Sequence, residues 1–547
     1  MESTSSRSMQ SALSALVRAR DMSLPDLVKL VRGETPADPR PNKALDPLVY
    51  ARLLHGYEHQ LLIIQIANHG FRVGWLHDVP RQSTHLKNHR SADAHAAAVV
   101  TRILEGVEAG TYVLLDRDIL AQWRVHVSPF GVVPKAHDGP EPAIRLIHDL
   151  SFPSGQSVND ATQHSSLPPV NYEFLSALAR RIEDLHDRHP GIPVLLLKGD
   201  VQGAFRHLRQ FAEDVHCMGG LVPLQDAGVI DLSAPFGWTG SPALYGVFGR
   251  AISFLVGRES PATMSSGDTD TTPFFQYEWV DDHVMIEASI GQRCRIAEDV
   301  LRLAMLAVLG PNAINESKFT PWSTTARILG LDWDSSARTV SMPPDKIAKA
   351  LHRVTEARKT PAKIATVQLQ RLLGSLRHVS ACLRAARPFY QRLHNVCARA
   401  PRFGYVSLTP WVRDDLLWFD RILRCEALQG VPTRLFAPNP PVDIHVYMDA
   451  SDDGLCVLDP AARAFIAIQF NAEERCAIAA TPSAFDINVR EQFAVALACL
   501  LLGPSWRAAA TTRWPHVRCW TDNRTAAART NKLSAQHPQA QELNRCI

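Results

Sequence analysis

The sequence predicts a multidomain protein of the α+β class, on three observations. At 547 residues the chain is too long for one compact core and suggests roughly three or four domains. Short β-like runs alternate with helical segments from about 120 to 340, and β-like runs return after 442. The composition, with 46% hydrophobic and 21% charged residues, is that of a soluble globular protein.

Composition shifts divide the chain into six parts. We expect a flexible Ser-, Pro- and charge-rich tail, a helical region, a mixed α/β region, a basic helical region, a Pro-rich linker and a final mixed region. Their bounds are 1–45, 46–115, 116–344, 345–430, 431–441 and 442–547.

Individual elements follow from periodicity and turn residues. Helical spacing of apolar residues precedes Gly70, a plausible C-cap, and an amphipathic helix is expected over 172–188. The apolar run at 192–201 predicts a buried strand. Two β-like runs flank the turn "DPAA" and predict a hairpin over 454–470.

Basic residues concentrate in one segment, although the net charge of the whole chain is only +3. Between Leu351 and Arg402 there are eleven Lys or Arg residues and one acid, Glu356. Such a segment suits a surface that faces phosphates, and a solvated helix face with counterions is the alternative.

The cysteines and the hydropathy pattern favour a soluble intracellular protein, cytoplasmic or nuclear. The ten cysteines are scattered without zinc-like spacing, which is typical of a reducing compartment. The N-terminus lacks the apolar core of a signal peptide, and the run from Phe493 is too short to cross a bilayer. We therefore expect no membrane partner.

Two adjacent aspartates, Asp281 and Asp282, lie between apolar stretches in "YEWVDDHVMIEAS". They could form a solvated turn, where Asp is common, or hold a metal. Asp200 ends the buried strand "PVLLLKGD", where it could serve a site or cap a helix. If the two strands are neighbours, three carboxylates meet, and oxygen-only ligands favour Mg²⁺.

Five motifs in this region, taken in order, resemble those of reverse transcriptases. "SPFGVVPKAHDGPEPAIRLIHDLS" resembles the fingers segment, "KGDVQGAF" the first palm motif and "APFGWTGSPALYGVFG" the second. "WVDD" is similar to the catalytic hairpin, and "GPNAINESKF" followed by "RILGLDWD" resembles the motifs that close the palm. The resemblance implies a right-hand polymerase, with fingers and palm over 116–344 built on an antiparallel sheet, and a helical thumb or connection over 345–430.

The resemblance also implies roles for individual residues. Asp200, Asp281 and Asp282 would hold two Mg²⁺ ions, with Mn²⁺ as an alternative, for nucleotidyl transfer. The implied nucleotide-binding residues are Lys135, Arg145, Phe205, Gly237 and Lys318. Lys135 and Arg145 would grip the triphosphate, the Phe205 ring would exclude a ribose 2′-hydroxyl, and Gly237 would let the backbone approach the nucleotide. Lys318 would protonate the leaving pyrophosphate.

Two of these roles have a plainer alternative. Phe205 could be a core residue, and Lys318 could be an ordinary surface lysine. Trp279 departs from the family pattern, which has Tyr at that position. This change affects packing against the primer end rather than a metal ligand.

A second carboxylate series follows the linker. Asp449 lies near a strand end in "IHVYMDAS", Glu491 in the first turn of an apolar helix, and Asp522 at a strand-to-helix junction. This β, α, β order resembles the ribonuclease H fold, whose carboxylates bind two Mg²⁺ ions, although capping residues and a solvated Glu are the alternative. The family uses a fourth acid or His well beyond the third, so we expect a partial domain, truncated at its C-terminus.

Together these features resemble the reverse transcriptase–ribonuclease H polyproteins of DIRS-type retroelements, which mobilise through a tyrosine recombinase. The implied partners are an RNA or DNA template with its primer, an RNA–DNA hybrid and deoxynucleoside triphosphates. The alternatives are a nucleic-acid-binding relic of a degraded element and a telomerase-like host polymerase, which the ribonuclease H-like series disfavours.

Overall fold

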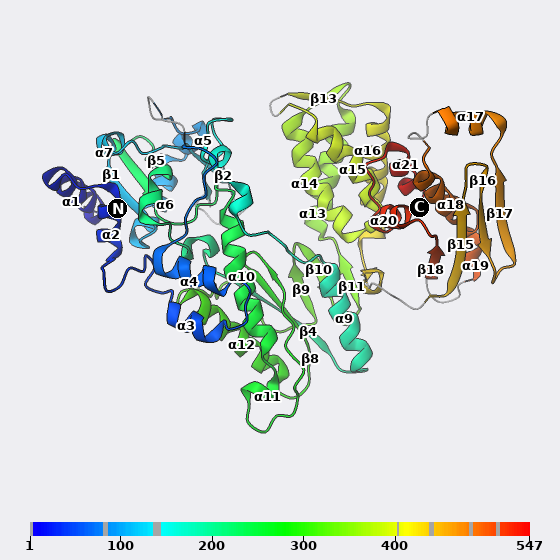
Figure 1. Ribbon diagram of the computed structural model, residues 1–547, viewed down its shortest axis with the longest axis horizontal. Helices are drawn as coiled ribbons and strands as arrows, with labels where there is room; N and C mark the ends of the chain where they lie inside the picture. Colours follow the sequence, from blue (N-terminus) through cyan, green and yellow to red (C-terminus); the bar gives the residue numbers. More distant parts are fainter. Residues whose placement is uncertain are drawn as a thin grey trace. The chain divides into compact units, whose positions relative to one another are not determined.

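The computed structural model describes most of the chain (Figure 1). The described residues are 4–79, 82, 86–134, 144–401, 404–436, 442–480, 485–509 and 515–547. They form two compact units, of which unit 1 comprises Met1–Glu173 with Leu195–Ser323, and unit 2 comprises Phe174–Val194 with Thr324–Ile547. Several largely antiparallel sheets combine with many helices in these units, which confirms the α+β class.

The N-terminal residues differ from the expected flexible tail. They form α1 (Thr4–Arg20) and α2 (Leu24–Arg32), and α2 begins at the N-cap Ser23 and ends at Gly33, whose φ is 64°. Val17 and Leu27 are buried in a core shared with the first strand of unit 1. The Ser- and Pro-rich composition concealed these apolar positions, which recur at helical spacing.

Helices and a small sheet make up the rest of the first half of unit 1. The helices are α3 (Pro47–Leu53), α4 (Gln60–His69), α5 (Arg90–Ala94), α6 (Ala96–Glu108), α7 (Arg117–Gln122) and α8 (Val158–Ala161). The strands are β1 (Tyr112–Asp116), β2 (Phe130–Pro134), β3 (Ile144–His148), β5 (Gly219–Leu221) and β6 (Ala227–Asp231). They form an antiparallel sheet of order β1-β6-β5 and a separate β2-β3 hairpin.

A second sheet, of order β4-β8-β7, carries the predicted palm aspartates. Its strands are β4 (Val194–Asp200), β7 (Glu278–Trp279) and β8 (Asp282–Ala288), and helices α10 (Ser241–Arg258), α11 (Pro261–Met264) and α12 (Arg293–Leu309) accompany it. α10 is buried nearly all round, because apolar and small residues occupy every face. Its Phe248 shares one core with Met285 of β8 and Met305 of α12, which fixes the sheet against both helices.

Unit 2 contains a bundle of four helices that lie side by side (Figure 1). They are α13 (Pro344–Lys359), α14 (Thr366–Cys382), α15 (Arg387–Ala398) and α16 (Pro410–Arg424). Unit 2 also contains α9 (Ser176–Arg188), which is not part of this bundle. A four-stranded sheet of order β14-β11-β10-β9 and a β12-β13 pair complete this part. Their strands are β9 (Thr325–Ile328), β10 (Leu331–Asp334), β11 (Thr339–Ser341), β12 (Lys363–Ala365), β13 (Tyr405–Ser407) and β14 (Val431–Pro432).

The expected linker over 431–441 is partly structured. Val431 and Pro432 form β14, which pairs with β11, and Thr433–Phe436 form a 3-10 helix against α9. Thr433 donates a hydrogen bond to the buried Glu183 of α9. Residues 437–441 lie outside the described residues.

The last part of unit 2 is a four-stranded sheet with helices on one face. The strands, of order β17-β16-β15-β18, are β15 (Ile444–Ala450), β16 (Gly454–Asp459), β17 (Ala464–Gln469) and β18 (Val517–Trp520). β15 runs parallel to β18 and antiparallel to β16. The helices are α17 (Ala472–Ala480), α18 (Ile487–Leu501), α19 (Gly503–Ala509), α20 (Arg524–Lys532) and α21 (Pro538–Cys546).

Apolar residues at every second strand position pack against α18 in this part. Val446 and Val457 contribute to the same buried core as Ala494 and Ala498 of α18. Within the described residues, no helix is long and apolar enough to cross a membrane.

Candidate carboxylate sites

Asp200 occupies the last position of β4 and is almost fully buried. Its Oδ1 accepts a 2.7 Å hydrogen bond from the Asn315 side chain, and its backbone oxygen accepts one from the Asn315 amide. Lys318 Nζ lies 3.1 Å from Asp200 Oδ2. The loop after α12 therefore holds this carboxylate in place from two directions.

Asp281 and Asp282 lie at the tight turn between β7 and β8. Trp279 pairs with Asp282, which leaves Val280 and Asp281 as the two turn residues. Val280 has a φ of 57°, an unusual value for a β-branched residue. The Asp281 carbonyl accepts a 2.8 Å hydrogen bond from the Val201 amide. This bond joins the turn to the end of β4, so the three aspartates lie at one end of the sheet, although their carboxylate oxygens do not all come within 4.8 Å of one another.

A second lysine neutralises this cluster. Lys198 Nζ lies 2.9 Å from Asp282 Oδ1, and both side chains are mostly buried. Lys198 precedes Asp200 by two positions on β4 and so shares its face of the sheet. Burial raises the pKa of Asp282, and the hydrogen bond from Lys198 opposes that rise.

The donor set suits a hard divalent cation, because it offers carboxylate oxygens without His or Cys. Two ammonium groups supply positive charge beside Asp200 and Asp282. In addition, the buried Tyr245 Oη has no hydrogen-bond partner among the described residues. Burial and the charges of Asp281 and Asp200 raise the pKa of Tyr245 well above its ordinary value. A polar group left unpaired beside carboxylates fits a site for a hydrated cation.

Aromatic side chains surround the carboxylates. Phe205 lies in a 3-10 helix just after β4 and packs against Phe236 and Tyr245, with ring centroids 5.0 and 5.7 Å away. Phe205 is nearly buried, whereas Phe236 is exposed. Trp279 packs against Tyr172 at 5.0 Å. The substituted residue of the predicted hairpin is thus held by a second aromatic ring.

The other predicted nucleotide-binding residues are less clustered. Arg145 is exposed on β3, opposite Val133 of β2, and Lys135 lies outside the described residues. Gly237 is required for a local reason, because a Cβ atom there would lie 1.6 Å from the His148 carbonyl oxygen. The close approach is to the protein's own backbone, and the role of Gly237 toward a nucleotide stays a prediction.

The second predicted series converges more tightly. Among the described residues, Asp449, Glu491 and Asp522 are the one set whose three candidate ligand atoms all lie within 4.8 Å of one another. They come from β15, α18 and the segment after β18, as the β, α, β order predicted. The parallel pairing of β15 with β18 places both strand ends at one edge of the sheet.

Glu491 is the buried member of this set. Its Oε1 accepts from the Ala450 amide at 3.1 Å, and its Oε2 accepts from Thr521 Oγ1 at 3.0 Å. Burial raises the pKa of Glu491, and the charges of Asp449 and Asp522 add to that rise. Three converging carboxylates repel one another, so this set also fits a divalent cation.

Sequence reasoning missed three residues of the first site. Lys198 could have been found from strand periodicity, since it shares a face with Asp200. Asn315 lies within the quoted motif "GPNAINESKF" but carried no role. Tyr245 lies in "APFGWTGSPALYGVFG", and no local signal distinguishes it from a core residue.

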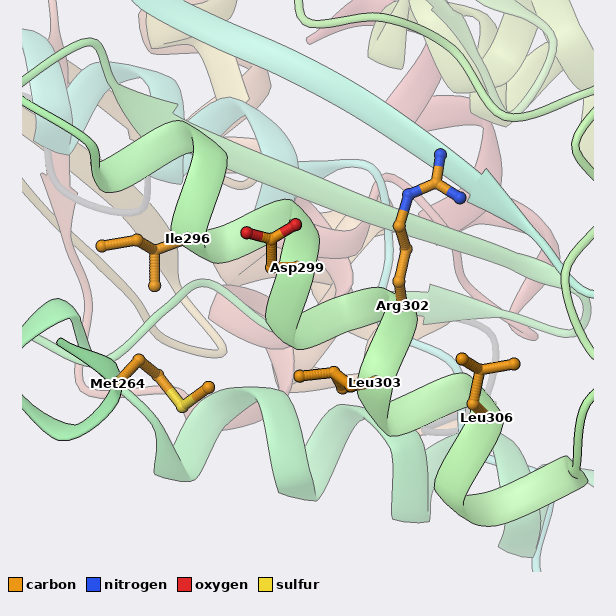
Figure 2. Close-up of a pocket in the computed structure, with 6 residues that line it drawn as sticks. All are labelled: Met264, Ile296, Asp299, Arg302, Leu303 and Leu306. Carbon is orange, nitrogen blue, oxygen red and sulfur yellow. The ribbon is translucent and has the colours of Figure 1, made fainter.

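A shallow surface pocket lies on unit 1. Met264 of α11 and Ile296, Leu303 and Leu306 of α12 form its apolar part, while Asp299 and Arg302 form its polar edge (Figure 2). The pocket contains none of the predicted site residues.

Among the comparisons with known proteins, only the one with solved structures gives matches. No protein-family model and no curated protein matches the chain. The chain is similar to solved structures of the foamy viral protease-reverse transcriptase. In complex with an RNA/DNA hybrid the TM-score is 0.46 at 12% identity, with 91% of this chain and 60% of that chain covered. The chain thus spans less than two thirds of that protein.

Two further structures of the foamy viral protein show similar values. For the dRH form in complex with double-stranded DNA, the TM-score is 0.45 at 12% identity, with 92% and 80% covered. For another complex with double-stranded DNA it is 0.42 at 12% identity, with 87% and 97% covered. At such low identity and TM-scores, the assignment of chemistry depends on the carboxylates themselves.

Proposed function

We propose that the chain is an RNA-directed DNA polymerase, which extends a primer on an RNA or DNA template from deoxynucleoside triphosphates. One observation carries the proposal: Asp200, Asp281 and Asp282 lie at one end of the β4-β8-β7 sheet. The Val201–Asp281 backbone hydrogen bond and the Lys198–Asp282 ion pair join their strands. Asp200 lies in "KGDVQGAF" and the two adjacent aspartates lie in "WVDD", two of the motifs that resemble those of reverse transcriptases.

The chemistry follows from the side chains. Two Mg²⁺ ions held there would clamp the attacking and leaving oxygens of an in-line displacement. Asp200 and Asp281 would hold them most directly, while Lys198 balances the charge of Asp282. The Phe205 ring, supported by Phe236 and Tyr245, would exclude a ribose 2′-hydroxyl. Lys318, whose side chain is about half exposed, would donate a proton to the leaving pyrophosphate.

The last part of the chain would act on the RNA of an RNA–DNA hybrid as a ribonuclease H-like domain. The convergence of Asp449, Glu491 and Asp522 supports this assignment. The combination of "DAS", "INVREQ" and "TDN" with the palm motifs supports an origin in a DIRS-type retroelement that mobilises through a tyrosine recombinase.

Only some of the basic side chains in the segment 351–402 would be free to contact phosphates. Arg358 pairs with Asp420, and Arg392 contacts Asp415 and Glu542, so these cations hold helices together. Arg371 and Arg377 of α14 are exposed instead. Because phosphate contacts release counterions, duplex binding should weaken steeply with salt, and less so in an Arg371→Gln, Arg377→Gln double variant.

The deciding experiment is Mg²⁺-dependent primer extension by the purified chain on RNA and DNA templates. Asp281→Ala should abolish extension while fluorescence anisotropy shows unchanged duplex binding. The matched control is Asp268→Ala, which changes an exposed acid in the loop before β7 and should extend normally. Wild-type extension by Asp281→Ala would overturn the metal assignment.

A nucleic-acid-binding relic is the second candidate, and the two lysine–aspartate pairs favour it. Lys198 and Lys318 already neutralise Asp282 and Asp200, so the cluster keeps its charge balance without a metal. Duplex binding without extension at any concentration of Mg²⁺ or Mn²⁺ would select this candidate.

A further inference from the structure

Four large apolar side chains form a continuous row across the last sheet of unit 2. Trp520 of β18 pairs with Tyr447 of β15, Tyr447 pairs with Leu458 of β16, and Leu458 pairs with Phe465 of β17. Since paired residues point to the same face, the row crosses every strand of the sheet. At ~4.8 Å between strands, the row is roughly 14 Å long.

This row, which we call the aromatic row, is exposed on the face opposite the helices. The exposed fractions are 44% for Trp520, 47% for Tyr447, 48% for Leu458 and 74% for Phe465. The alternate residues of the same strands, such as Val446 and Val457, are buried against α18. Among the described residues, the core on this sheet is thus built on one face, and the other face carries exposed apolar groups that normally mark a binding surface.

The ring planes at the β15–β18 end of the row are nearly parallel. The Tyr447 and Trp520 planes differ by 13°, with centroids 6.4 Å apart, and the His445 and Trp520 planes differ by 16° at 6.0 Å. Trp520 Nε1 hydrogen-bonds to His445 Nδ1 at 2.9 Å, which fixes the two rings edge to edge. Three near-parallel rings, two of which are joined by a hydrogen bond, therefore form an ordered aromatic patch on this face of the sheet.

The two sides of the row, before and after it along β15 and β18, differ in charge. Arg518 lies beside His445 in the β15–β18 pairing, and its guanidinium carbon lies 5.8 Å from the Trp520 ring centroid. On the other side, Asp449 follows Tyr447 by two residues and Asp522 follows Trp520 by two residues. The flat rings therefore lie between a guanidinium and the converging carboxylates.

We propose that the aromatic row is a stacking platform for unpaired bases of a single-stranded nucleic acid that leads into the Asp449–Glu491–Asp522 site. Every base has a π-face, so stacking on Tyr and Trp requires no particular sequence. Arg518 contacts a backbone phosphate on one side of the platform. The proposal deepens the proposed ribonuclease H-like function, on which it depends, by naming an unpaired strand that continues from the hybrid as a further part of the bound nucleic acid.

The test is photocrosslinking of a single-stranded oligouridylate that carries 5-iodouracil to the full chain. Excess primer–template duplex occupies the polymerase site during irradiation. Crosslinked peptides should contain Tyr447 or Trp520, and a Tyr447→Ala, Trp520→Ala double variant should bind the oligonucleotide about tenfold more weakly. Tyr405→Ala removes an exposed aromatic ring elsewhere in unit 2 and should change neither result.

Two outcomes overturn the platform. The first is a failure of either expected result: crosslinks confined to peptides without Tyr447 or Trp520, or an unchanged oligonucleotide affinity in the double variant. The other is a concentration-dependent doubling of mass that the double variant abolishes, because the row would then pair with a second copy of the chain. Mg²⁺-dependent hybrid cleavage is measured on the same preparations. Cleavage by wild type with no crosslinks on the sheet refutes the platform alone, whereas crosslinks without cleavage refute the nuclease function alone.

Discussion

Lys198 of β4 and Asp282 of β8 form a 2.9 Å ion pair. Lys198 lies two residues before Asp200 on the same strand. Lys198→Met leaves a mostly buried carboxylate without its cation, which should cost about 3 kcal/mol of unfolding free energy. The pKa of Asp282, already raised by burial, should rise further. An acid with a raised pKa favours the folded state at low pH, so the loss should be larger at pH 8 than at pH 5.

Urea unfolding at both pH values measures this difference. Lys198→Arg keeps the charge and should recover most of the stability, and it should restore primer extension. An equal loss at both pH values would mean that the pair is not electrostatic in origin.

Asp415 of α16 is predicted to make stability depend on pH. It is fully buried beside Arg545 at 2.6 Å and Arg392 at 3.5 Å, yet burial raises its pKa to about 7. Its contribution is therefore complete below the unfolded pKa near 4 and is lost as pH rises through about 7. Between pH 5 and pH 8, the free energy of unfolding of the wild type should fall by on the order of 2 kcal/mol more than that of Asp415→Asn. Parallel urea midpoints for the two proteins would contradict this.

Divalent cations should stabilise unit 2 through the Asp449–Glu491–Asp522 set. Metal binding to the folded state alone raises the unfolding temperature by mass action and relieves repulsion among the carboxylates. The unfolding temperature of the wild type should rise between 0 and about 10 mM MgCl₂, a range that covers the affinity of a weak site. The unfolding temperature of an Asp449→Asn, Asp522→Asn double variant should not change. Glu473→Gln changes an exposed acid of α17 and should respond like the wild type.

Phe205→Val should relax the choice of sugar. The smaller side chain removes the ring that packs against Phe236 and Tyr245 and opens space beside Asp200. We expect ribonucleoside triphosphate incorporation to rise at least about tenfold relative to deoxynucleotides, which corresponds to about 1.4 kcal/mol of discrimination. Single-nucleotide extension kinetics measure the ratio, and Phe174→Ala, an exposed ring outside the cluster, should leave it unchanged.

Gly237→Ala should fail through the fold. A Cβ atom 1.6 Å from the His148 carbonyl forces the segment before α10 away from β3. Asn159, which donates a 2.8 Å hydrogen bond to the Gly237 carbonyl, would lose its partner. Thermal unfolding should show a loss of several degrees before any nucleotide is added. Normal stability with a defect confined to nucleotide binding would contradict this reason for the glycine.

Local patterns predicted much of the fold. The hairpin with the turn "DPAA" is present as β16 and β17, and the amphipathic run over 172–188 forms α9. These elements follow from periodicity and turn residues within a few positions of one another. α1 and α2 were missed because their apolar residues gain burial only against distant parts of the chain, α1 against β1 and α2 against the 3-10 helix Ala212–Cys217.

The candidate sites also combine features that local sequence predicts with features that depend on distant segments. Strand ends marked Asp200, Asp281 and Asp449 in the sequence, because a carboxylate after a buried strand is conspicuous. The lysine partners of Asp200 and Asp282 depend on the approach of distant segments, and the aromatic row depends on the pairing of four strands. Neither relationship has a signature within any single segment.

The last helix has a consequence for how the chain opens. α21 packs against α18, and Arg545 and Gln541 bind Asp415 of α16 and the Pro388 carbonyl of α15. Amide protons of α16 and of α18 should therefore exchange with deuterium through one shared opening event, rather than as two independent segments. Loss of the α21 contacts would separate the two exchange rates, and the β15–β18 sheet with α18 would then open without the helical bundle.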